Sequence, residues 1–288
     1  MGERAEGRAT LATPVEASGI GLHSGNPVQL RVGPAPPGSG VVFRVGAGEV
    51  PARLDSVVDA RNATSLGHDG ARVTTVEHLL AALAMRGLDD ALVELDAPEP
   101  PAFDGSAAPF LALLERAGTR GQGGSRPVVR ILAEVAVRDG EREISIAPGP
   151  GLGVDYEIDF AAAAIGRQSL SLPRLDAATF REQIAPARTF GFLEDVERLR
   201  SAGLASGASL ANTVVVDGAR VLNDEGLRWP DEFVRHKILD LLGDFALLGA
   251  PVIGHLRVCR GGHALHHALL RALHAHPSAW ELLDAAPA

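Results

Sequence analysis

The sequence predicts an α+β fold, arranged as a duplicated two-domain layered α/β sandwich. Each half is expected to be a mainly antiparallel sheet with helices, and the helices are expected to pack between the two sheets. Three observations lead to this prediction. Each half opens with short apolar segments typical of strands, continues with an apolar helix that carries a histidine near its start, and closes with a glycine followed by a further helix.

A glycine-rich segment divides the chain into the two halves. Residues 118–127 (GTRGQGGSRP) are polar and end at Pro127, a composition typical of a linker. We therefore expect a first α+β repeat over residues 1–120 and a second over residues 127–288.

The strand patterns of the two halves match. Residues 28–32 (VQLRV) lead through GPAPPGSG to residues 41–45 (VVFRV). In the second half, residues 144–147 (ISIA) lead through PGPGLG to residues 154–158 (VDYEI). Each pair is predicted to be a hairpin, because two apolar runs separated by a Pro/Gly-rich turn are typical of paired strands.

The helices of the two halves also correspond. Residues 76–87 (VEHLLAALAMRG) carry His78, and residues 234–249 (VRHKILDLLGDFALLG) carry His236 at the equivalent place. The offset between the halves is 116 residues at the strands and 158 at the histidines, which predicts an insertion at about 160–225 in the second half. Two α+β halves can also look alike without a common origin, so the duplication is an interpretation.

Composition restricts the classes of function. The chain has 288 residues and a net charge of −9, and its Lys and Arg residues form no cluster of the kind that binds nucleic acid. Its single cysteine, Cys259, excludes an intrachain disulfide, so a metal would have to be bound by histidines and carboxylates. No run approaches the ~20 apolar residues that cross a bilayer, and the polar N-terminus does not resemble a signal peptide. We expect a cytoplasmic protein without stable membrane insertion.

One candidate metal pair lies on the helix of the second half. His236 and Asp240 are four residues apart, so their side chains project from one face of a helix about one turn apart. Asp244 lies a further turn along and is placed to orient a neighbouring group. A His–Asp pair of this spacing is more often a solvated pair than a metal site, so the pair needs a third ligand to be convincing.

The helix of the first half supplies that ligand. Thr74 or Thr75 can cap a helix that opens with Glu77 and His78. Alone, this dipeptide fits a helix-start glutamate beside a core histidine. Together with His236 and Asp240, however, it gives a His₂–carboxylate set with an open fourth position, which is typical of catalytic zinc. Glu77 is then placed to act as general base on the attacking water.

Two further segments are candidates for the site. His263 follows two glycines and is predicted to begin a helix, where a protonated imidazole could stabilise an oxyanion and protonate a leaving amine. Among the later histidines of that helix, only His266 is an additional candidate. Residues 187–204 carry Thr189 in an aromatic-flanked turn and then an apolar stripe, a pattern that forms a core more often than a ligand tunnel.

The motifs of this chain closely resemble those of the UDP-3-O-acyl-N-acetylglucosamine deacetylase family, the zinc enzymes of lipid A biosynthesis. The matching stretches are spaced over nearly the whole chain in the family's order, and they are GIGLHSG (19–25), TVEHLLAAL (75–83), PAFDGSAAPF (101–110), RTFGF (188–192), DEFVRHKILDLLGD (231–244) and GHAL (262–265).

The resemblance assigns a role to each part of the metal centre. It implies that His78, His236 and Asp240 bind zinc, and the same ligands would also fit Fe²⁺. Glu77 matches the general base. His263 matches the family's cationic histidine, which stabilises the oxyanion and protonates the leaving amine.

Residues around this centre are also assigned by the resemblance. Asp244 would orient His263, Lys237 would contact the substrate, and Thr189 would support the tetrahedral intermediate. Phe190 and Phe192 fall at substrate-contacting positions. The family's hydrophobic passage for the substrate acyl chain maps onto the predicted insertion and replaces the core interpretation of the stripe, near Leu193, Val196, Leu199, Leu204 and Leu210.

The resemblance implies hydrolysis of the N-acetyl group of a small-molecule substrate, UDP-3-O-acyl-N-acetylglucosamine, to the free amine and acetate. We expect a monomer and no nucleic-acid partner. Two alternatives stay open at this point: a zinc deacetylase of another N-acetyl sugar, and an inactive homologue that binds a UDP-sugar.

Overall fold

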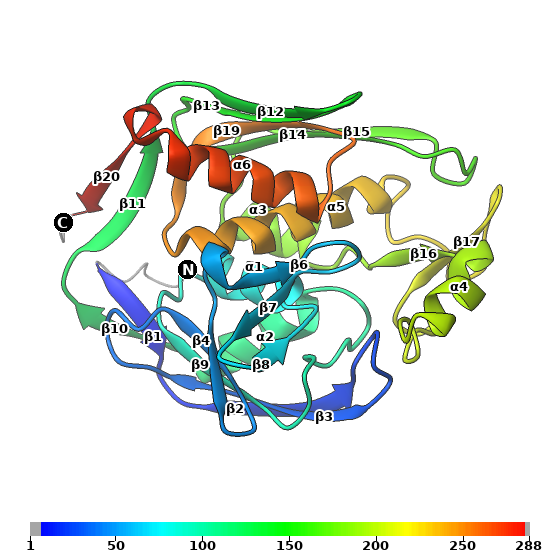
Figure 1. The fold of residues 1–288 in the computed structure, drawn as a ribbon, viewed down its shortest axis with the longest axis horizontal. Helices are drawn as coiled ribbons and strands as arrows, with labels where there is room; N and C mark the ends of the chain where they lie inside the picture. Colours follow the sequence, from blue (N-terminus) through cyan, green and yellow to red (C-terminus); the bar gives the residue numbers. More distant parts are fainter. Residues whose placement is uncertain (1–6, 286–288) are drawn as a thin grey trace.

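The computed structural model describes residues 7–285, and its elements form two main sheets with the long helices between them (Figure 1). One sheet lies along the top of Figure 1 and the other along the bottom. The layered α+β sandwich expected from the sequence is therefore confirmed. The ends of the two predicted repeats, residues 1–6 and 286–288, lie outside the described residues.

The first sheet is built from residues 15–95. Its neighbours run antiparallel, except that β4 and β9 are parallel. Alternate residues of β3 are buried, so Val28, Leu30 and Val32 face the helices. The strands follow the order β2 (Val15–Ile20), β3 (Pro27–Pro34), β9 (Ala91–Leu95), β4 (Val41–Val45) and β5 (Gly48–Pro51).

The second sheet repeats this order and these directions. Here β14 and β19 form the parallel pair. Its strands are β12 (Val135–Asp139), β13 (Arg142–Ala147), β19 (Val252–Cys259), β14 (Leu152–Asp159) and β15 (Arg167–Leu172). At the start of β19, β11 (Arg126–Ile131) and β20 (Trp280–Ala285) extend the sheet. Separately, β1 (Arg8–Leu11) pairs with β10 (Thr119–Gly123).

The two predicted hairpins are wrong, although their strands exist. A later strand lies between the members of each pair: β9 separates β3 from β4, and β19 separates β13 from β14. The physical reason is that, in each half, the chain returns to the sheet after its first long helix and enters between the two strands of the predicted hairpin. The returning strand, β9 or β19, pairs antiparallel with one of them and parallel with the other.

Four long helices fill the space between the sheets. Helix α1 packs against α5, and α5 packs against α6. The long helices are α1 (Glu77–Arg86), α2 (Ala108–Ala117), α5 (Glu232–Phe245) and α6 (His263–Ala275). The shorter helical segments are α3 (Ala177–Thr179), α4 (Val196–Ser201), η1 (Leu54–Ser56), η2 (Phe180–Ile184), η3 (Leu193–Asp195), η4 (Ala246–Leu248) and η5 (Pro277–Ala279).

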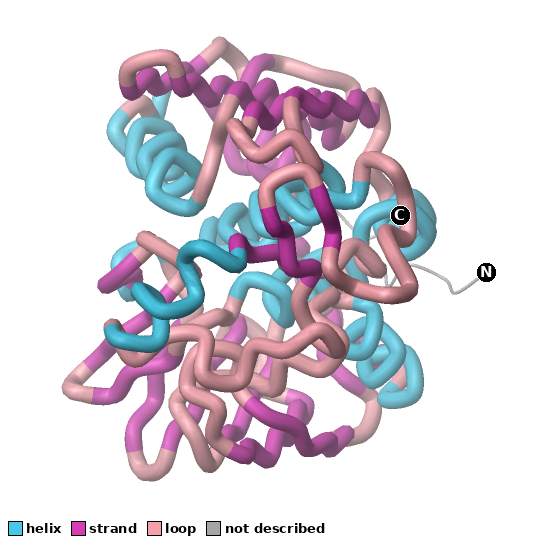
Figure 2. The backbone as a smooth tube through the Cα atoms, turned by 90° about the vertical axis from the view of Figure 1, so that its right-hand side faces the viewer, coloured by secondary structure: helices cyan, strands magenta, loops and turns pink. Residues whose placement is uncertain are grey.

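Each half makes an excursion between its last sheet strand and its long helix. The shorter one, residues 52–76, contains β6 (Val57–Asp59), β7 (Ser65–His68) and β8 (Ala71–Val73). The longer one, residues 173–231, contains α4, β16 (Phe190–Phe192), β17 (Val214–Asp217) and β18 (Arg220–Val221). Its part with α4, β16 and β17 projects at the right of Figure 1 and faces the viewer in Figure 2, whereas α3 lies in the middle of Figure 1.

The predicted insertion at about 160–225 includes β15. Within it, β15 is the edge strand of the second sheet, at the place that β5 takes in the first. The part that departs from the first-half pattern therefore starts after Leu172. None of the helices in residues 7–285 combines the length and the apolar character needed to span a membrane.

Candidate metal centre and active site

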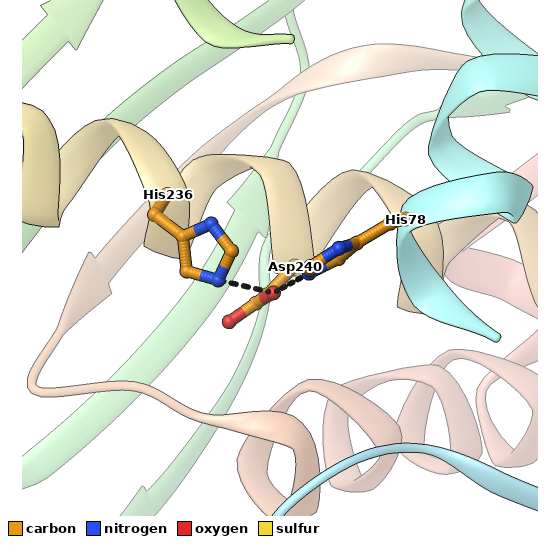
Figure 3. A group of neighbouring side chains, drawn as sticks. All are labelled: His78, His236 and Asp240. Atoms are coloured by element: carbon orange, nitrogen blue, oxygen red, sulfur yellow. Dashed lines mark ion pairs between the residues drawn. The ribbon is translucent and has the colours of Figure 1, made fainter. Parts of the chain in front are cut away.

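Three buried side chains from both halves meet between α1 and α5 (Figure 3). His78 comes from the first turn of α1, and His236 and Asp240 come from successive turns of α5. Asp240 Oδ1 lies 3.4 Å from His236 Nε2 and 3.6 Å from His78 Nε2. The two imidazole rings are 5.0 Å apart and nearly perpendicular, so both point their Nε2 atoms at the same space.

The donor set fits a divalent metal ion. Ligand atoms at ~2.0–2.1 Å from a tetrahedral ion lie about 3.3–3.4 Å from one another, and the two separations at Asp240 Oδ1 are close to this spacing. Two imidazoles and one carboxylate leave a fourth position free for water or substrate. These residues could therefore hold a catalytic metal.

The neighbours of His236 and Asp240 hold them in metal-binding form. His236 Nδ1 donates to the carbonyl of Ala187 at 3.1 Å, which leaves the Nε2 lone pair available. Burial lowers the pKa of His236 to about 4, so its imidazole stays neutral. Burial raises the pKa of Asp240, but the charge of Lys237 and the hydrogen bond to the carboxylate outweigh it and hold the pKa well below the usual range.

Lys237 lies beside this pair. Its Nζ donates to Asp240 Oδ2 at 2.6 Å and lies 6.0 Å from the centre of the Phe190 ring. The ammonium therefore binds the carboxylate oxygen that does not face His78 and His236, at the edge of the candidate metal centre.

Glu77 is buried next to the candidate metal ligands at the start of α1. Its Oε2 accepts a hydrogen bond from the backbone N–H of Thr64 at 3.1 Å, and its Oε1 lies 3.9 Å from His263 Nε2. Burial raises the pKa of Glu77, against the opposing charge of His263. A carboxyl group with a raised pKa is suited to accept a proton during catalysis.

Asp244 lies at the centre of a second cluster. Its Oδ2 accepts hydrogen bonds from the Nδ1 atoms of His263 (2.7 Å) and His266 (2.8 Å). Its Oδ1 accepts from the hydroxyl of Thr64 (2.5 Å) and from His267 Nε2 (3.1 Å). These separations are hydrogen-bond lengths, and the two at Oδ2 are shorter than the about 3.3 Å that separates two ligands of a tetrahedral ion. We therefore interpret this cluster as hydrogen-bonded rather than metal-binding.

His263 begins α6, as the sequence predicts, and faces Glu77 and Asp240 from the other side. Burial alone would lower its pKa, but the charge and hydrogen bond of Asp244 outweigh burial and raise the pKa to about 9. The imidazole is therefore protonated at neutral pH.

The expected threonine cap of α1 is wrong. Val76 occupies the capping position, and no side chain caps the helix. Thr75 instead has a φ of 56°, which is strained for a β-branched residue, and its hydroxyl donates to Glu99 at 2.8 Å. The same buried carboxylate accepts the backbone N–H groups of His23 and Ser24, so it ties the GIGLHSG loop to the start of α1.

A buried ion pair holds the segment before β16. Arg188 Nε donates to Glu232 Oε1 at 2.9 Å, and both side chains are almost fully buried. This contact fixes the positions of its two chain neighbours, Ala187 and Thr189. The Ala187 carbonyl accepts the hydrogen bond from His236. Thr189 lines a small cavity together with His78.

Phe190 connects the long excursion to the metal ligands. Its ring lies 6.1 Å from His236 and 5.0 Å from Phe233, edge to face in both cases. Phe192 joins it through Phe160. Beyond these rings, Leu193 and Leu210 are 46% and 48% exposed, and the other three residues of the predicted passage are half-buried, namely Val196, Leu199 and Leu204.

Sequence reasoning missed four buried residues of the site. No sequence pattern singled out Thr64, Glu99, Tyr156 or His267 for the site, although Tyr156 lies in the predicted strand at residues 154–158. Each of the four contacts a partner at least 23 residues away in the chain. The only available signal was polarity inside apolar segments. A separate cavity of about 1570 Å³ lies at the C-terminal ends of α1 and α5, and no predicted site residue lines it.

Comparison with known proteins identifies similar chains. A family model described as UDP-3-O-acyl N-acetylglycosamine deacetylase matches residues 8–275. The UDP-3-O-acyl-N-acetylglucosamine deacetylase of Myxococcus xanthus is 49% identical over 280 residues, which cover 96% of this chain and 89% of that protein. The enzyme of the same name from Phenylobacterium zucineum is 47% identical over 279 residues, covering 95% of each chain. That from an Anaeromyxobacter species is 48% identical over 270 residues, covering 93% and 88%.

Proposed function

The chain belongs to the UDP-3-O-acyl-N-acetylglycosamine deacetylase family, and we propose that it hydrolyses the N-acetyl group of UDP-3-O-acyl-N-acetylglucosamine. The products are acetate and the free amine of the UDP-sugar. The observation that carries the proposal is the spacing of His78, His236 and Asp240, with Glu77 and His263 beside them.

We assign zinc as the metal, held by His78, His236 and Asp240, because two imidazoles and a carboxylate are a common catalytic zinc set. Fe²⁺ would fit the same ligands. A bound divalent ion supplies Lewis acidity, which polarises the acetyl carbonyl and lowers the pKa of water. The assignment is supported by the neutral state of His236 and the ionised state of Asp240.

The chain's own residues then move the protons. Glu77 accepts a proton from the attacking water while the water oxygen bonds to the acetyl carbon. The positive charge of His263 stabilises the oxyanion, and the Thr189 hydroxyl is placed to support it. His263 next donates its proton to the sugar nitrogen as the C–N bond breaks. Asp244 keeps His263 oriented and charged throughout, and Lys237 contacts the substrate.

The long excursion is assigned to the acyl chain. Phe190 and Phe192 contact the substrate next to the metal ligands, and the apolar passage runs outward over Leu193, Val196, Leu199, Leu204 and Leu210. Support comes from the position of Phe190 beside His236 and from the exposure of Leu193 and Leu210, which leaves apolar surface free for a hydrocarbon chain.

We further propose that the enzyme acts in the cytoplasm as a monomer, in the synthesis of lipid A. Relatives named for the same reaction support the role, and the single cysteine suits a reducing compartment. Light scattering of the purified protein tests the monomeric state, because the measured molar mass should then equal the mass of one chain.

The deciding experiment measures acetate release from 3-O-acylated and non-acylated UDP-N-acetylglucosamine, with metal content before and after chelation. We expect turnover of the acylated sugar, loss of turnover on chelation, and recovery with Zn²⁺. Equal rates on the two sugars would instead favour a deacetylase of other N-acetyl sugars. No turnover with bound metal would favour an inactive homologue.

Two substitutions test the assigned proton transfers. Glu77→Ala and His263→Ala should each lower kcat by roughly 10²-fold or more while the metal stays bound, because each removes a general acid–base group. Full activity of either variant contradicts the assignment.

A further inference from the structure

A buried hydrogen-bond chain runs from the second sheet to His263. Tyr156 on β14 contacts His266 Nε2 through its hydroxyl at 3.0 Å. His266 Nδ1 contacts Asp244 Oδ2 at 2.8 Å, and the same oxygen accepts from His263 Nδ1 at 2.7 Å. Tyr156, His266 and Asp244 are all fully or almost fully buried.

We propose that His266 and Tyr156 are positioning residues for the deacetylation reaction: they hold the Asp244 carboxylate so that it fixes the orientation of His263. This inference rests on the proposed function and adds to it two residues that touch neither the metal ligands nor the proposed substrate atoms.

The direction of each hydrogen bond is set by the carboxylate. Asp244 is ionised and can only accept, so His266 Nδ1 must carry the hydrogen. In a neutral imidazole Nε2 is then the acceptor, and the Tyr156 hydroxyl must donate to it. Burial lowers the pKa of His266, which favours this neutral form. Tyr156 therefore selects the tautomer of His266 that can donate to Asp244.

Four donors hold the carboxylate from both sides. His263 and His266 share Oδ2, while Thr64 and His267 occupy Oδ1. Loss of the His266 donor leaves His263 as the only donor to Oδ2, so this oxygen is held less firmly in the orientation that His263 requires. Small losses of orientation in groups that support a catalytic residue cost about 10–100-fold in activity.

The hydrogen-bond chain also links α6 to the second sheet. A Cβ atom on Gly261 would lie 2.6 Å from the Tyr156 hydroxyl oxygen and 2.3 Å from Val258 Cγ1. Glycine at this position therefore allows the turn before His263 to pass directly over Tyr156. The start of α6 is thereby positioned by the tyrosine as well as by Asp244.

The test compares two substitutions of His266 that differ in one donor. His266→Asn keeps an amide N–H at the place of Nδ1, whereas His266→Phe keeps a ring and removes the donor. We expect His266→Asn to retain kcat within about threefold, and His266→Phe to lower kcat by about 10-fold or more with KM nearly unchanged. His274→Phe, an exposed histidine of the same helix, is the matched control and should leave kcat unchanged.

A second pair of variants tests the tyrosine. Tyr156→Phe removes only the hydroxyl and should lower kcat severalfold in the wild-type background. The same change should have no further effect in the His266→Asn background, because an amide has no ring tautomer to select. All rates are taken per folded, metal-loaded molecule, from metal content and the melting temperature.

The outcomes separate the two hypotheses. Wild-type kcat in His266→Phe, or an equal loss in His266→Asn and His266→Phe, contradicts the positioning role while deacetylation by the wild type still stands. If His266→Phe does not fold, the Tyr156→Phe pair decides, and equal effects in both backgrounds overturn the proposal. A wild-type protein without deacetylase activity contradicts the proposed function itself.

Discussion

At the scale of single residues, distance separates two neighbouring carboxylates of α5. Asp240 Oδ1 lies 3.4 and 3.6 Å from two imidazole nitrogens, whereas Asp244 Oδ2 receives hydrogen bonds of 2.7 and 2.8 Å from two others. The first spacing leaves room for an ion, and the second does not. We infer that Asp240 is a ligand and that Asp244 orients His263.

The ionisation of His263 and Glu77 predicts the dependence of activity on pH. His263 must be protonated, and its pKa of about 9 means that kcat/KM should fall as the pH rises through about 9. Glu77 must be ionised, and burial raises its pKa above 4.5, so the acidic limb should lie above that value. A profile of kcat/KM from about pH 5 to 10 checks both limbs. An alkaline limb at about 6.5, the ordinary value of histidine, would contradict a protonated His263.

At the scale of elements, the contact between α1 and α5 brings the ligands together. A Cβ on Gly243 would lie 2.0 Å from the backbone oxygen of Glu77, so only glycine allows the two helices this close approach. His78 follows Glu77 directly, and Asp240 lies one turn before Gly243. The distance between the metal ligands of the two halves therefore depends on this contact.

Gly243→Ala should push the helices apart. We expect the free energy of unfolding to fall by about 1–3 kcal/mol or more and metal affinity to fall with it, because the obstructing atoms are backbone. Denaturant unfolding and metal titration measure the two effects. Gly151→Ala is the control, since a Cβ there meets nothing within 4 Å. Unchanged metal affinity in Gly243→Ala would mean that this contact does not set the spacing of the site.

The long excursion is the element assigned to the acyl chain. Leu210→Ser should raise KM for the 3-O-acylated sugar about fivefold, the effect of losing ~1 kcal/mol of apolar contact, and should leave the non-acylated sugar unaffected. Leu132→Ser is a matched control, because Leu132 is 49% exposed and Leu210 is 48% exposed. Equal effects of the two substitutions on KM would contradict a contact between Leu210 and the acyl chain.

At the scale of the whole molecule, the candidate metal centre joins the two halves. His78 belongs to the first α+β unit, and His236 and Asp240 belong to the second. The two sheets repeat one strand order and one set of directions, which supports the interpretation of a duplication. The repeat boundaries at residues 1–120 and 127–288 stay a prediction.

A metal that binds only the folded protein should stabilise the whole chain. Each tenfold excess of free metal over Kd contributes about 1.4 kcal/mol, so chelation should lower the melting temperature and restored Zn²⁺ should raise it. Calorimetry of the two forms measures this. The His78→Ala variant is the control, and its melting temperature should respond much less to Zn²⁺. An unchanged melting temperature of the wild type would argue against a metal at this position.

The sequence alone predicted the fold class correctly and pointed to the candidate residues of the metal centre. The linker predicted at residues 118–127 is wrong, because these residues form β10 and the start of β11. Helical spacing put His236 and Asp240 on one face, two glycines put His263 at a helix start, and Glu77 and His78 open the equivalent helix of the first half. These features depend on neighbours within one or two turns, which a single chain segment already contains.

Only the tertiary structure decided which strands pair and what surrounds the reacting groups. The sequence predicted hairpins where β9 and β19 separate the strands, and it missed Glu99 beneath the GIGLHSG loop and the Tyr156–His266 contact. The physical reason is sequence separation. Strand order and buried hydrogen bonds depend on distant partners, such as Tyr156 and His266, 110 residues apart, and Thr64 and Asp244, 180 residues apart. Such pairs leave no periodic trace in either segment.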